Sequence, residues 1–387
     1  MKLVYITSTS FVDGDFPLVK YLIEKEVDVH LFIHVRTSCL NSTLFSLKQA
    51  YPKSGIFDSS IYGEEIDKFK PYIGIDKIHI INTNSGGGFK GMRSICKMEE
   101  QAIREIDPDV VHFIGWPELY EIPLTFKFYK KIIVTIHDPV PHKIDGRAKK
   151  FRMVRLATDW IIRRYILLNP LMTDDFCKYY RLNKSKIRYS RLGNYDVLKM
   201  FGEVVPSTQK TILFVGRISE YKGIVYLLEA YSQIMHSYPD TKLVVAGGGE
   251  YHFDITPYQN NPQIEIVNRY IDMDEMGYYF KNCEFVVCPY VTATQSGVVV
   301  SALAVNKPII VTNVGGLPSM IEEGKSGLII PPKDATALAN AMSRLLSNPD
   351  QLKEMENYIA KDAVQGSNAW GKIAENYIKI YDEFIKP

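Results

Sequence analysis

Cysteine is scarce in this chain of 387 residues. There are five cysteines, scattered and odd in number, and none forms a Cys-x-x-Cys pair. This usage argues against a disulfide framework and against a zinc site, and it favours a reducing cytoplasm.

Excess charge and long apolar runs are missing as well. The formal net charge is only +2, which argues against a general nucleic-acid binder and leaves room only for local electrostatic sites. No apolar run approaches the roughly 20 residues that span a bilayer. The start MKLVYITSTS lacks the charged-then-apolar pattern of a signal peptide. We therefore expect a cytoplasmic protein, at most peripheral at the inner face of the plasma membrane.

Core-forming residues, by contrast, are abundant. With 46% hydrophobic and 23% charged residues, the composition is that of a globular protein. The chain is too long for one ordinary domain, and two domains of about 150–200 residues are expected.

The first half alternates short apolar runs, rich in β-branched residues, with helical patterns. One helix is expected behind Asp15, a candidate N-cap with Pro17 in the first turn. Because the runs have the character of strands buried on both faces, the alternation predicts a parallel, doubly wound sheet. The predicted strands cover residues 2–7, 28–35, 77–82, 110–115 and 131–138.

The pattern restarts after a linker-like stretch at 202–210. Apolar runs with helices between them predict a second Rossmann-like half, and its clearest helix begins at Gly223 with a period of 3.6 residues. Ligands of such sheets bind at the carboxyl ends of the strands, so a cleft between the halves is the expected site. The predicted strands cover residues 211–216, 242–247, 263–268, 285–290, 307–312 and 326–332.

The stretch ILFVGRISEYKG, residues 212–223, leaves a buried strand and at once places two cations around a helix start. A helix N-terminus exposes unpaired N–H groups and about half a positive charge, so it favours an anion. Arg217 adds a planar fork of donors, and Lys222 adds a mobile point charge. Each residue alone is more often a solvated surface cation. Together, at this spacing, they predict a diphosphate site.

A second anion site is predicted in CPYVTATQSGVVVSALAV, residues 288–305. A strand ends at Pro289, a small polar loop follows, and Ser296 and Gly297 lead into an apolar segment. Gly297 lets the backbone approach a ligand closely, and the helix N–H groups from Val298 onward can hold a phosphate oxygen. The alternative is an ordinary turn with Ser296 as N-cap.

Two residues of the first half are candidates for the other side of the site. Gly14, in VDGDFP, lies in an expected βα turn where a ligand can come close, and His137 stands at the end of a strand. A strand-end histidine in a cleft can donate to a sugar hydroxyl or to a reacting group. Because a lone histidine is more often structural, its role stays open from the spacing alone.

Two longer segments resemble the C-terminal domain of retaining glycosyltransferases of family 4, which have the GT-B fold. They are FVGRISEYKGIVYLLEAY and VTNVGGLPSMIEEGKSGLIIPPKDATALANAM, and VTIHDPVPH is similar to the acceptor-domain strand of the same enzymes. The resemblance is specific over about 210–345 and looser in the first half. It implies two Rossmann-like domains facing a cleft. They would be an acceptor side over 1–203, a nucleotide-sugar side over 204–365, and a last helix, 366–387, that packs back on the first domain.

The resemblance implies roles for the residues that match it. Arg217 and Lys222 match the pair that grips the diphosphate of a nucleotide-sugar. Gly14 matches a first-loop glycine beside the donor phosphates, and His137 matches a histidine beside the transferred sugar. Gly316 falls on the family's Gly-Gly turn near the donor. No metal and no cofactor are expected, because cationic side chains and helix N-termini neutralise the leaving diphosphate.

The chain departs from the family where two glutamates, eight positions apart, usually contact the sugar and the ribose. Ser301 stands at the second position, and the first falls near Ala293 or Thr294, so neither carboxylate is present. A branch of these enzymes with a similar segment also lacks the pair, so its loss need not mean loss of activity. Thr294, Gln295 and Ser296 then become the candidates for polar contacts with the donor.

Basic residues gather at 143–164 and are interleaved with apolar ones. Such a segment can lie on anionic lipid headgroups, and a surface-bound acceptor suits enzymes that glycosylate lipid-linked sugars. The solvated face of a core helix is an equal alternative. The cations are Lys143, Arg147, Lys149, Lys150, Arg152, Arg155, Arg163 and Arg164.

The resemblance implies a metal-independent, retaining glycosyltransferase with Arg217, Lys222 and His137 as catalytic residues. It would move a hexose from a nucleotide-diphosphate sugar, UDP favoured over GDP, to a glycan or lipid-linked saccharide in cell-surface polysaccharide synthesis. Two alternatives stay open. One is a non-catalytic nucleotide-binding partner, which the missing glutamates motivate. The other is a nucleotide-sugar epimerase of the same architecture, for which the sequence offers no convincing set of acid and base residues.

Overall fold

The computed structural model describes residues 1–42, 44–83, 88–137, 139, 161–366 and 368–386. The chain divides into two compact units: unit 1 comprises Met1–Gly193 with Trp370–Pro387, and unit 2 comprises Asn194–Ala369. Among the described residues, no helix combines the length and the apolar character needed to cross a membrane.

Unit 1 is built on a sheet whose described strands follow the order β3-β4-β2-β1-β5-β6-β7-β8. Neighbours pair in parallel except β3 with β4, which are antiparallel. The central strands β1, β5 and β6 are buried almost throughout, as expected for parallel strands covered on both faces. The strands are β1 (Lys2–Ser8), β2 (Asp28–Arg36), β3 (Gly55–Asp58), β4 (Ile78–Thr83), β5 (Val110–Ile114), β6 (Ile132–Ile136), β7 (Arg164–Leu167) and β8 (Ile187–Tyr189).

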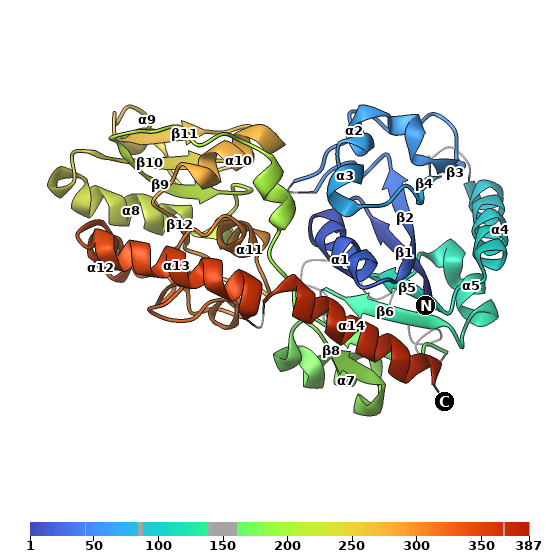
Figure 1. The fold of residues 1–387 in the computed structure, drawn as a ribbon. Helices are drawn as coiled ribbons and strands as arrows, with labels where there is room; N and C mark the ends of the chain where they lie inside the picture. The colour runs from blue at the N-terminus through green and yellow to red at the C-terminus, as the bar shows by residue number, and fades with distance from the viewer. Residues whose placement is uncertain (43, 84–87, 138, 140–160, 367, 387) are drawn as a thin grey trace. The chain divides into compact units, whose positions relative to one another are not determined.

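Helices and short 3₁₀ turns cover this sheet (Figure 1). The helices are α1 (Val12–Glu24), α2 (Glu64–Asp67), α3 (Lys70–Ile73), α4 (Gly88–Ile106), α5 (Ile122–Lys127), α7 (Thr173–Tyr180) and α14 (Trp370–Ile385). The 3₁₀ turns are η1 (Ser59–Tyr62), η2 (Leu119–Glu121), η3 (Pro170–Met172) and η4 (Lys184–Lys186).

The last helix, α14, belongs to unit 1 although unit 2 precedes it in the chain. It packs against α1, and its buried residues recur at helical spacing. The Tyr381 hydroxyl lies 2.7 Å from Nδ1 of His112 on β5. At the other end, the Trp370 ring covers Gly193 so closely that a Cβ there would stand 2.5 Å from it. The buried residues of α14 are Trp370, Ile373, Ala374, Tyr377, Ile380 and Tyr381.

Unit 2 is built on a second sheet, all parallel, with its described strands in the order β11-β10-β9-β12-β13-β14. Its strands are β9 (Lys210–Val215), β10 (Thr241–Ala246), β11 (Ile264–Val267), β12 (Phe285–Cys288), β13 (Ile309–Thr312) and β14 (Gly327–Ile330). Its helices are α8 (Ile224–Ile234), α9 (Thr256–Gln259), α10 (Met273–Lys281), α11 (Gly297–Ala304), α12 (Ala335–Leu346) and α13 (Pro349–Gln365). Its 3₁₀ turns are η5 (Asp196–Met200), η6 (Glu220–Lys222), η7 (Met235–Ser237) and η8 (Leu317–Met320).

The predicted architecture of two Rossmann-like parallel sheets is confirmed. Each predicted strand is present, with its ends shifted by at most two residues. The short strands β3, β7 and β8 at the two edges of the unit 1 sheet were not predicted. Arg164, the last residue of the basic segment, lies in β7. Residues 143–160 lie outside the described residues, so the helical alternative for them stays a prediction.

The start of α1 differs from the prediction. The helix predicted behind Asp15 begins earlier, at Val12. The backbone N–H of Asp15 already donates to the Phe11 carbonyl oxygen at 3.2 Å. The Asp15 carboxylate accepts hydrogen bonds from the hydroxyls of Tyr5 and Thr7 on β1, so it does not cap the helix. Its burial raises the pKa of Asp15 to about 7, although these two hydrogen bonds act in the opposite direction.

Candidate functional site

Glycines bring the carboxyl ends of β9 and β10 into direct backbone contact. The Gly216 N–H donates to the Ala246 carbonyl oxygen at 3.0 Å. A Cβ on Gly247 would stand 2.0 Å from the Gly216 oxygen, and one on Gly249 would stand 2.2 Å from the Ile218 oxygen. No side chain fits between these two loops, so the chain leaves β9 along a fixed path.

The turn that follows β9 is fixed against the end of β12. It passes through η6 and reaches Gly223, whose φ of 66° is left-handed, before α8 begins. A Cβ on Gly223 would stand 2.0 Å from the Pro289 carbonyl oxygen. On the same side, the Val291 N–H donates to the Tyr221 carbonyl oxygen at 2.8 Å. Only glycine fits at this position, and it sets the direction in which the preceding lysine leaves the turn.

Lys222 points its ammonium at an aromatic face. Its Nζ lies 3.7 Å from the ring centroid of Tyr290, which is buried, and 5.1 Å from that of Tyr221. Cations are attracted to such rings by their quadrupole. Burial, together with the positive charge of Arg217, lowers the pKa of Lys222 to about 8. The lysine is therefore held in a place that makes its charged form costly until an anion arrives.

Arg217 lies five residues earlier and is exposed. Neither Arg217 nor Lys222 forms an ion pair with a carboxylate of the described residues. Two cations near one turn, without an acidic partner, leave a local excess of positive charge. That excess is what the sequence predicted for a diphosphate site.

The start of α11 lies beside the same loops. A Cβ on Gly216 would come within 3.7 Å of a Val298 methyl group, which places the end of β9 against the first turn of α11. Ser296 is at the N-cap position but makes no side-chain cap, because its hydroxyl lies 3.3 Å from that of Tyr290. The first N–H groups of α11, from Gly297 onward, are therefore not covered by a capping side chain. This arrangement suits an anion.

The polar loop before α11 rests on the Gly-Gly turn. A Cβ on Gly315, where φ is 51°, would stand 1.5 Å from the Ala293 carbonyl oxygen. Gly316 is buried and opens η8. Thr294 and Gln295 are half-buried in the loop itself. Unit 2 thus gathers the predicted donor-contacting loop and the Gly-Gly turn at one edge of its sheet.

Ser301, also predicted to contact the donor, does not lie in the polar loop before α11. It is 0% exposed in α11, and its hydroxyl has no hydrogen-bond partner among the described residues. A direct contact between Ser301 and a donor is therefore not supported by its position. The serine keeps the place in the chain where the family carries a glutamate, but it does not reach the surface.

The two candidates of unit 1 lie in different surroundings. His137 follows β6, is half-buried and stacks on the Phe11 ring at 4.4 Å. Gly14, predicted in a turn, lies inside the first turn of α1 between the buried Asp13 and Asp15. These two acidic residues already place negative charge in the first turn of the helix. The position does not favour a phosphate at Gly14.

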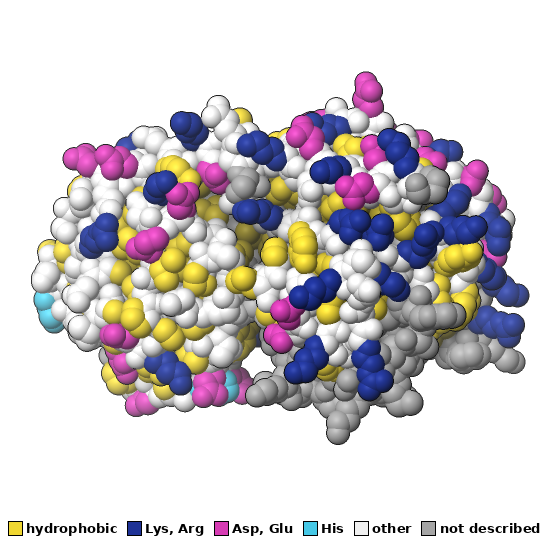
Figure 2. Space-filling view, turned by 90° about the horizontal axis from the view of Figure 1, so that it is seen from below, with side chains coloured by type: hydrophobic (Ala, Val, Ile, Leu, Met, Phe, Trp, Pro, Cys, Tyr) yellow, Lys and Arg dark blue, Asp and Glu magenta, His cyan; other side chains and the backbone are white. Residues whose placement is uncertain are grey.

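Most of the basic segment 143–164 lies outside the described residues, among them Lys149 and Lys150. Of its last two cations, Arg163 is exposed, and Arg164 donates to the Ser185 carbonyl oxygen at 3.2 Å. The face drawn in Figure 2 shows many Lys and Arg side chains over unit 1, on the right of the view.

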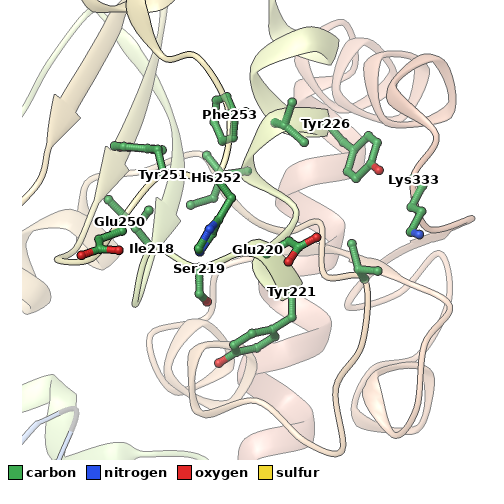
Figure 3. Close-up of a pocket in the computed structure, with 13 residues that line it drawn as sticks. Ile218, Ser219, Glu220, Tyr221, Tyr226, Glu250, Tyr251, His252, Phe253 and Lys333 are labelled. Carbon is green, nitrogen blue, oxygen red and sulfur yellow. The ribbon is translucent and has the colours of Figure 1, made fainter. Parts of the chain in front are cut away.

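A pocket of about 300 Å³ opens beside η6, within unit 2 (Figure 3). Its walls are Ser219, Glu220 and Tyr221 on one side and the loop after β10, residues 250–253, on another. Arg217 and Lys222 are not among its lining residues, so it is separate from the paired cations. Only the three glycines that precede the loop hint at this pocket in the sequence, because residues 250–253 follow no ligand-binding spacing.

The comparison with known proteins identifies the same part of the chain, which lies in unit 2. Residues 198–362 match the family model "Glycosyl transferases group 1". An uncharacterized glycosyltransferase of Methanocaldococcus jannaschii is 30% identical over 180 residues, which is 46% of each chain. The D-inositol 3-phosphate glycosyltransferase of Corynebacterium urealyticum is 28% identical over 187 residues, 46% of this chain and 44% of that one. The chain thus spans about half the length of these curated relatives.

Among solved structures, the Anabaena protein HepE in complex with UDP aligns over 99% of this chain and 100% of its own. The TM-score is 0.69 and the identity 11%. This likeness covers both units. The protein has the GT-B fold.

Proposed function

We propose that the protein is a glycosyltransferase that uses a nucleotide-diphosphate sugar as donor. The observation that carries the proposal is the pair Arg217 and Lys222, which has no carboxylate partner in the described chain and lies beside the uncapped start of α11. The family match over 198–362 supports it, since that stretch contains every one of these groups.

The finer proposal is a retaining, metal-independent transferase of family 4. The bond between the anomeric carbon and the diphosphate oxygen breaks, and a bond from that carbon to an acceptor oxygen forms on the same face. The acceptor hydroxyl gives its proton to the departing phosphate oxygen. Arg217, Lys222 and the first N–H groups of α11 stabilise the charge that develops on the leaving group, and fixed donors are most effective there.

The donor is proposed to be a UDP-hexose in preference to a GDP-hexose, and the similarity to a protein solved with UDP supports that order. Thr294 and Gln295, on the loop before α11, are proposed to contact the sugar. His137 is proposed to position the sugar or the acceptor. The acceptor is proposed to be a glycan or lipid-linked saccharide of cell-surface polysaccharide synthesis.

The deciding experiment is a panel of UDP- and GDP-sugars, tested for binding by calorimetry and for hydrolysis or transfer. We expect a UDP-sugar to bind and to be turned over slowly to UDP and free sugar without added metal. An anomeric product of inverted configuration would contradict the retaining proposal. Absence of binding to every member of the panel would overturn the function.

A second candidate is a non-catalytic nucleotide-binding protein, and the buried, unpartnered Ser301 favours it. The usual carboxylate handle on the ribose and sugar is missing from the chain. Binding of a nucleotide-sugar without turnover on any acceptor in the panel would select this candidate. Release of an epimerised nucleotide-sugar would instead select the epimerase alternative.

Attachment to a membrane surface is proposed through the basic segment 143–164. Charge reversal at Lys149 and Lys150 should reduce sedimentation of the protein with anionic liposomes, since each cation near such a surface contributes about 1 kcal/mol. Unchanged sedimentation would refute the attachment.

A further inference from the structure

Unit 1 buries three potential metal ligands that come from three separate elements. His34 lies on β2, Glu99 on α4 and Glu121 at the end of η2. They are 5%, 1% and 1% exposed. One atom of each residue lies within 4.8 Å of the corresponding atoms of the other two. We call these three residues the His34 cluster.

One polar atom of each residue in the His34 cluster already has a neighbour. The Tyr120 hydroxyl donates to Oε1 of Glu99 at 3.4 Å and lies 3.3 Å from Nδ1 of His34. The backbone N–H of Glu118 donates to Oε2 of Glu121. The tautomer of His34 decides which atom donates in the contact between Tyr120 and Nδ1. With the proton on Nδ1, Nε2 of His34 offers a lone pair, which is the form that a metal ion binds.

The other three atoms are without hydrogen-bond partners in the described chain. They are Nε2 of His34, Oε2 of Glu99 and Oε1 of Glu121, and all three are buried. Nε2 and the Glu121 oxygen lie 2.9 Å apart and form an ion pair when His34 is protonated. Three buried polar atoms thus converge, and two of them belong to carboxylates. Buried polar groups without partners are costly, so a positive charge between them, carried by protons or by a metal ion, would stabilise the cluster.

We propose that the His34 cluster binds one divalent transition-metal ion, with zinc the first candidate. One imidazole nitrogen and two carboxylate oxygens are ligand types that zinc accepts. Neighbouring ligands of a tetrahedral zinc are roughly 3.3 Å apart. That distance lies between the 2.9 Å from Nε2 of His34 to Oε1 of Glu121 and the 4.8 Å limit of the group. Two carboxylates with a neutral imidazole carry two negative charges, which a divalent ion balances.

The proposed ion is structural. The three residues come from a strand, a helix and a 3₁₀ turn, so one ion ties together segments that are distant in sequence. Tyr120 fixes the imidazole from its far side, the usual arrangement around a ligating histidine. Two residues beyond His34, Arg36 pairs with Glu118, the residue whose N–H holds Glu121. The fourth position falls to water or to a second carboxylate oxygen.

Protons are the competing occupants of the cluster. Burial raises the pKa of Glu99 well above its usual range, and the negative charge of Glu121 raises it further. Cys96 lies one turn before Glu99 on α4 and is buried, but burial raises the pKa of its thiol to about 11. Its sulfur stays protonated and is not one of the converging atoms.

The test uses the full chain, stripped of metal with a chelator, exposed to zinc chloride alone and then dialysed against metal-free buffer. We expect one zinc per chain by elemental analysis. The same measurement is made after His34→Gln and Glu99→Gln, which should lose the ion. The matched controls are His30→Gln, on the same strand, and Glu100→Gln, on the same helix, and both should keep it.

X-ray absorption of the wild-type protein decides the matter even where a variant does not fold. The expected zinc shell contains only nitrogen and oxygen at about 2.0 Å, whereas a cysteine site would show sulfur at about 2.3 Å. A sulfur shell, retention of zinc by Glu99→Gln, or loss of zinc in His30→Gln would overturn the proposal. So would failure of the wild type to retain zinc, manganese or iron(II), which would assign the cluster to shared protons. None of these readouts depends on transferase activity.

Discussion

Units 1 and 2 each hold an unbalanced group of charges, and the two groups have opposite sign. In unit 2, Arg217 and Lys222 have no carboxylate partner in the described chain. In unit 1, the His34 cluster buries two carboxylates beside one imidazole, and three of its polar atoms have no hydrogen-bond partner among the described residues. The first group follows the carboxyl end of β9 and includes the exposed Arg217, whereas the second is enclosed. The exposure of each group therefore predicts its ligand. We expect an anion that binds and dissociates in unit 2, and a cation that stays bound in unit 1.

The two groups also differ in how the chain assembles them. The cations of unit 2 stand within one strand–turn–helix segment, so one local path fixes both. The His34 cluster is brought together by sheet and helix packing from three separate segments. Local assembly depends on backbone geometry at single residues, whereas the buried cluster depends on the whole of unit 1. Substitutions in each group, and the pH dependence of the anion site, test this difference between the two units.

The largest effect is expected at Gly223, where the turn in unit 2 leaves no room for a side chain. Gly223→Ala would place a Cβ 2.0 Å from a backbone oxygen, in a left-handed conformation with φ of 66°. Such backbone costs about 1–2 kcal/mol for a residue with a side chain, and the overlap adds to it. We expect the free energy of unfolding to fall by about 3 kcal/mol or more in urea denaturation.

The control is Gly324→Ala, which has a similar φ of 75° but no neighbour within 4 Å. It should lose only the conformational part, about 1 kcal/mol. Equal losses in the two variants would mean that contact with the Pro289 carbonyl does not hold the turn in place.

The next effect separates charge from geometry in unit 2. Lys222→Ala should weaken binding of UDP by about tenfold or more, because a hydrogen bond to a charged group contributes at least ~1.5 kcal/mol. Calorimetry measures it. Lys361→Ala removes an exposed lysine on α13 and should leave the affinity unchanged. If the two variants bind UDP equally well, the assignment of Lys222 to the diphosphate is wrong.

A smaller effect, on metal affinity, is expected from Tyr120, whose hydroxyl contacts two residues of the His34 cluster. Tyr120→Phe removes the hydroxyl that fixes His34 and Glu99 but none of the three ligands. Loss of such an outer partner typically weakens metal binding about 10- to 100-fold. Competition with a chelator of known affinity should show zinc weaker by about tenfold while the stoichiometry of one stays. Complete loss of zinc, or no change at all, would show that the hydroxyl does not have this orienting role.

The smallest effect is the pH dependence of the anion site. With a pKa of about 8, Lys222 is charged below that pH and loses its proton above it. Since the diphosphate binds the ammonium form, the UDP affinity should fall above pH 8, by less than tenfold for each pH unit. Lys222→Arg stays charged and should flatten the profile. A wild-type affinity that stays constant up to pH 10 would contradict the lowered pKa.

These contrasts explain what the sequence could reveal. Most strands of both sheets were predictable because β-branched residues cluster in short runs. The pair Arg217 and Lys222 could be proposed from the sequence because both fall within one segment. The start of α1 was not predictable, because the expected cap, Asp15, is held by hydroxyls of β1. Strands β3, β7 and β8 were not predicted, although the predicted strands β11 to β14 are no longer than β3 and β7.

Among the site residues, too, those whose surroundings depend on tertiary packing could not be placed from the sequence. The burial of Ser301 depends on what packs around α11, and its sequence neighbours do not show this. The His34 cluster was not found because its members are spread from β2 to η2 and follow no ligand spacing. The number of cysteines bears only on zinc bound by sulfur. A site made of carboxylates and imidazole can be recognised only when the tertiary contacts are known.

The return of α14 to unit 1 has a consequence for synthesis on the ribosome. Residues 1–193 emerge first, but the helix that packs on α1 is translated only after residues 194–369. At about 5–20 residues per second, unit 1 waits roughly 10–35 s for its last element. During that interval the surface that α14 will cover is open to chaperones, whereas unit 2 is contiguous and can fold as soon as it leaves the exit tunnel. The unit that begins first is completed last.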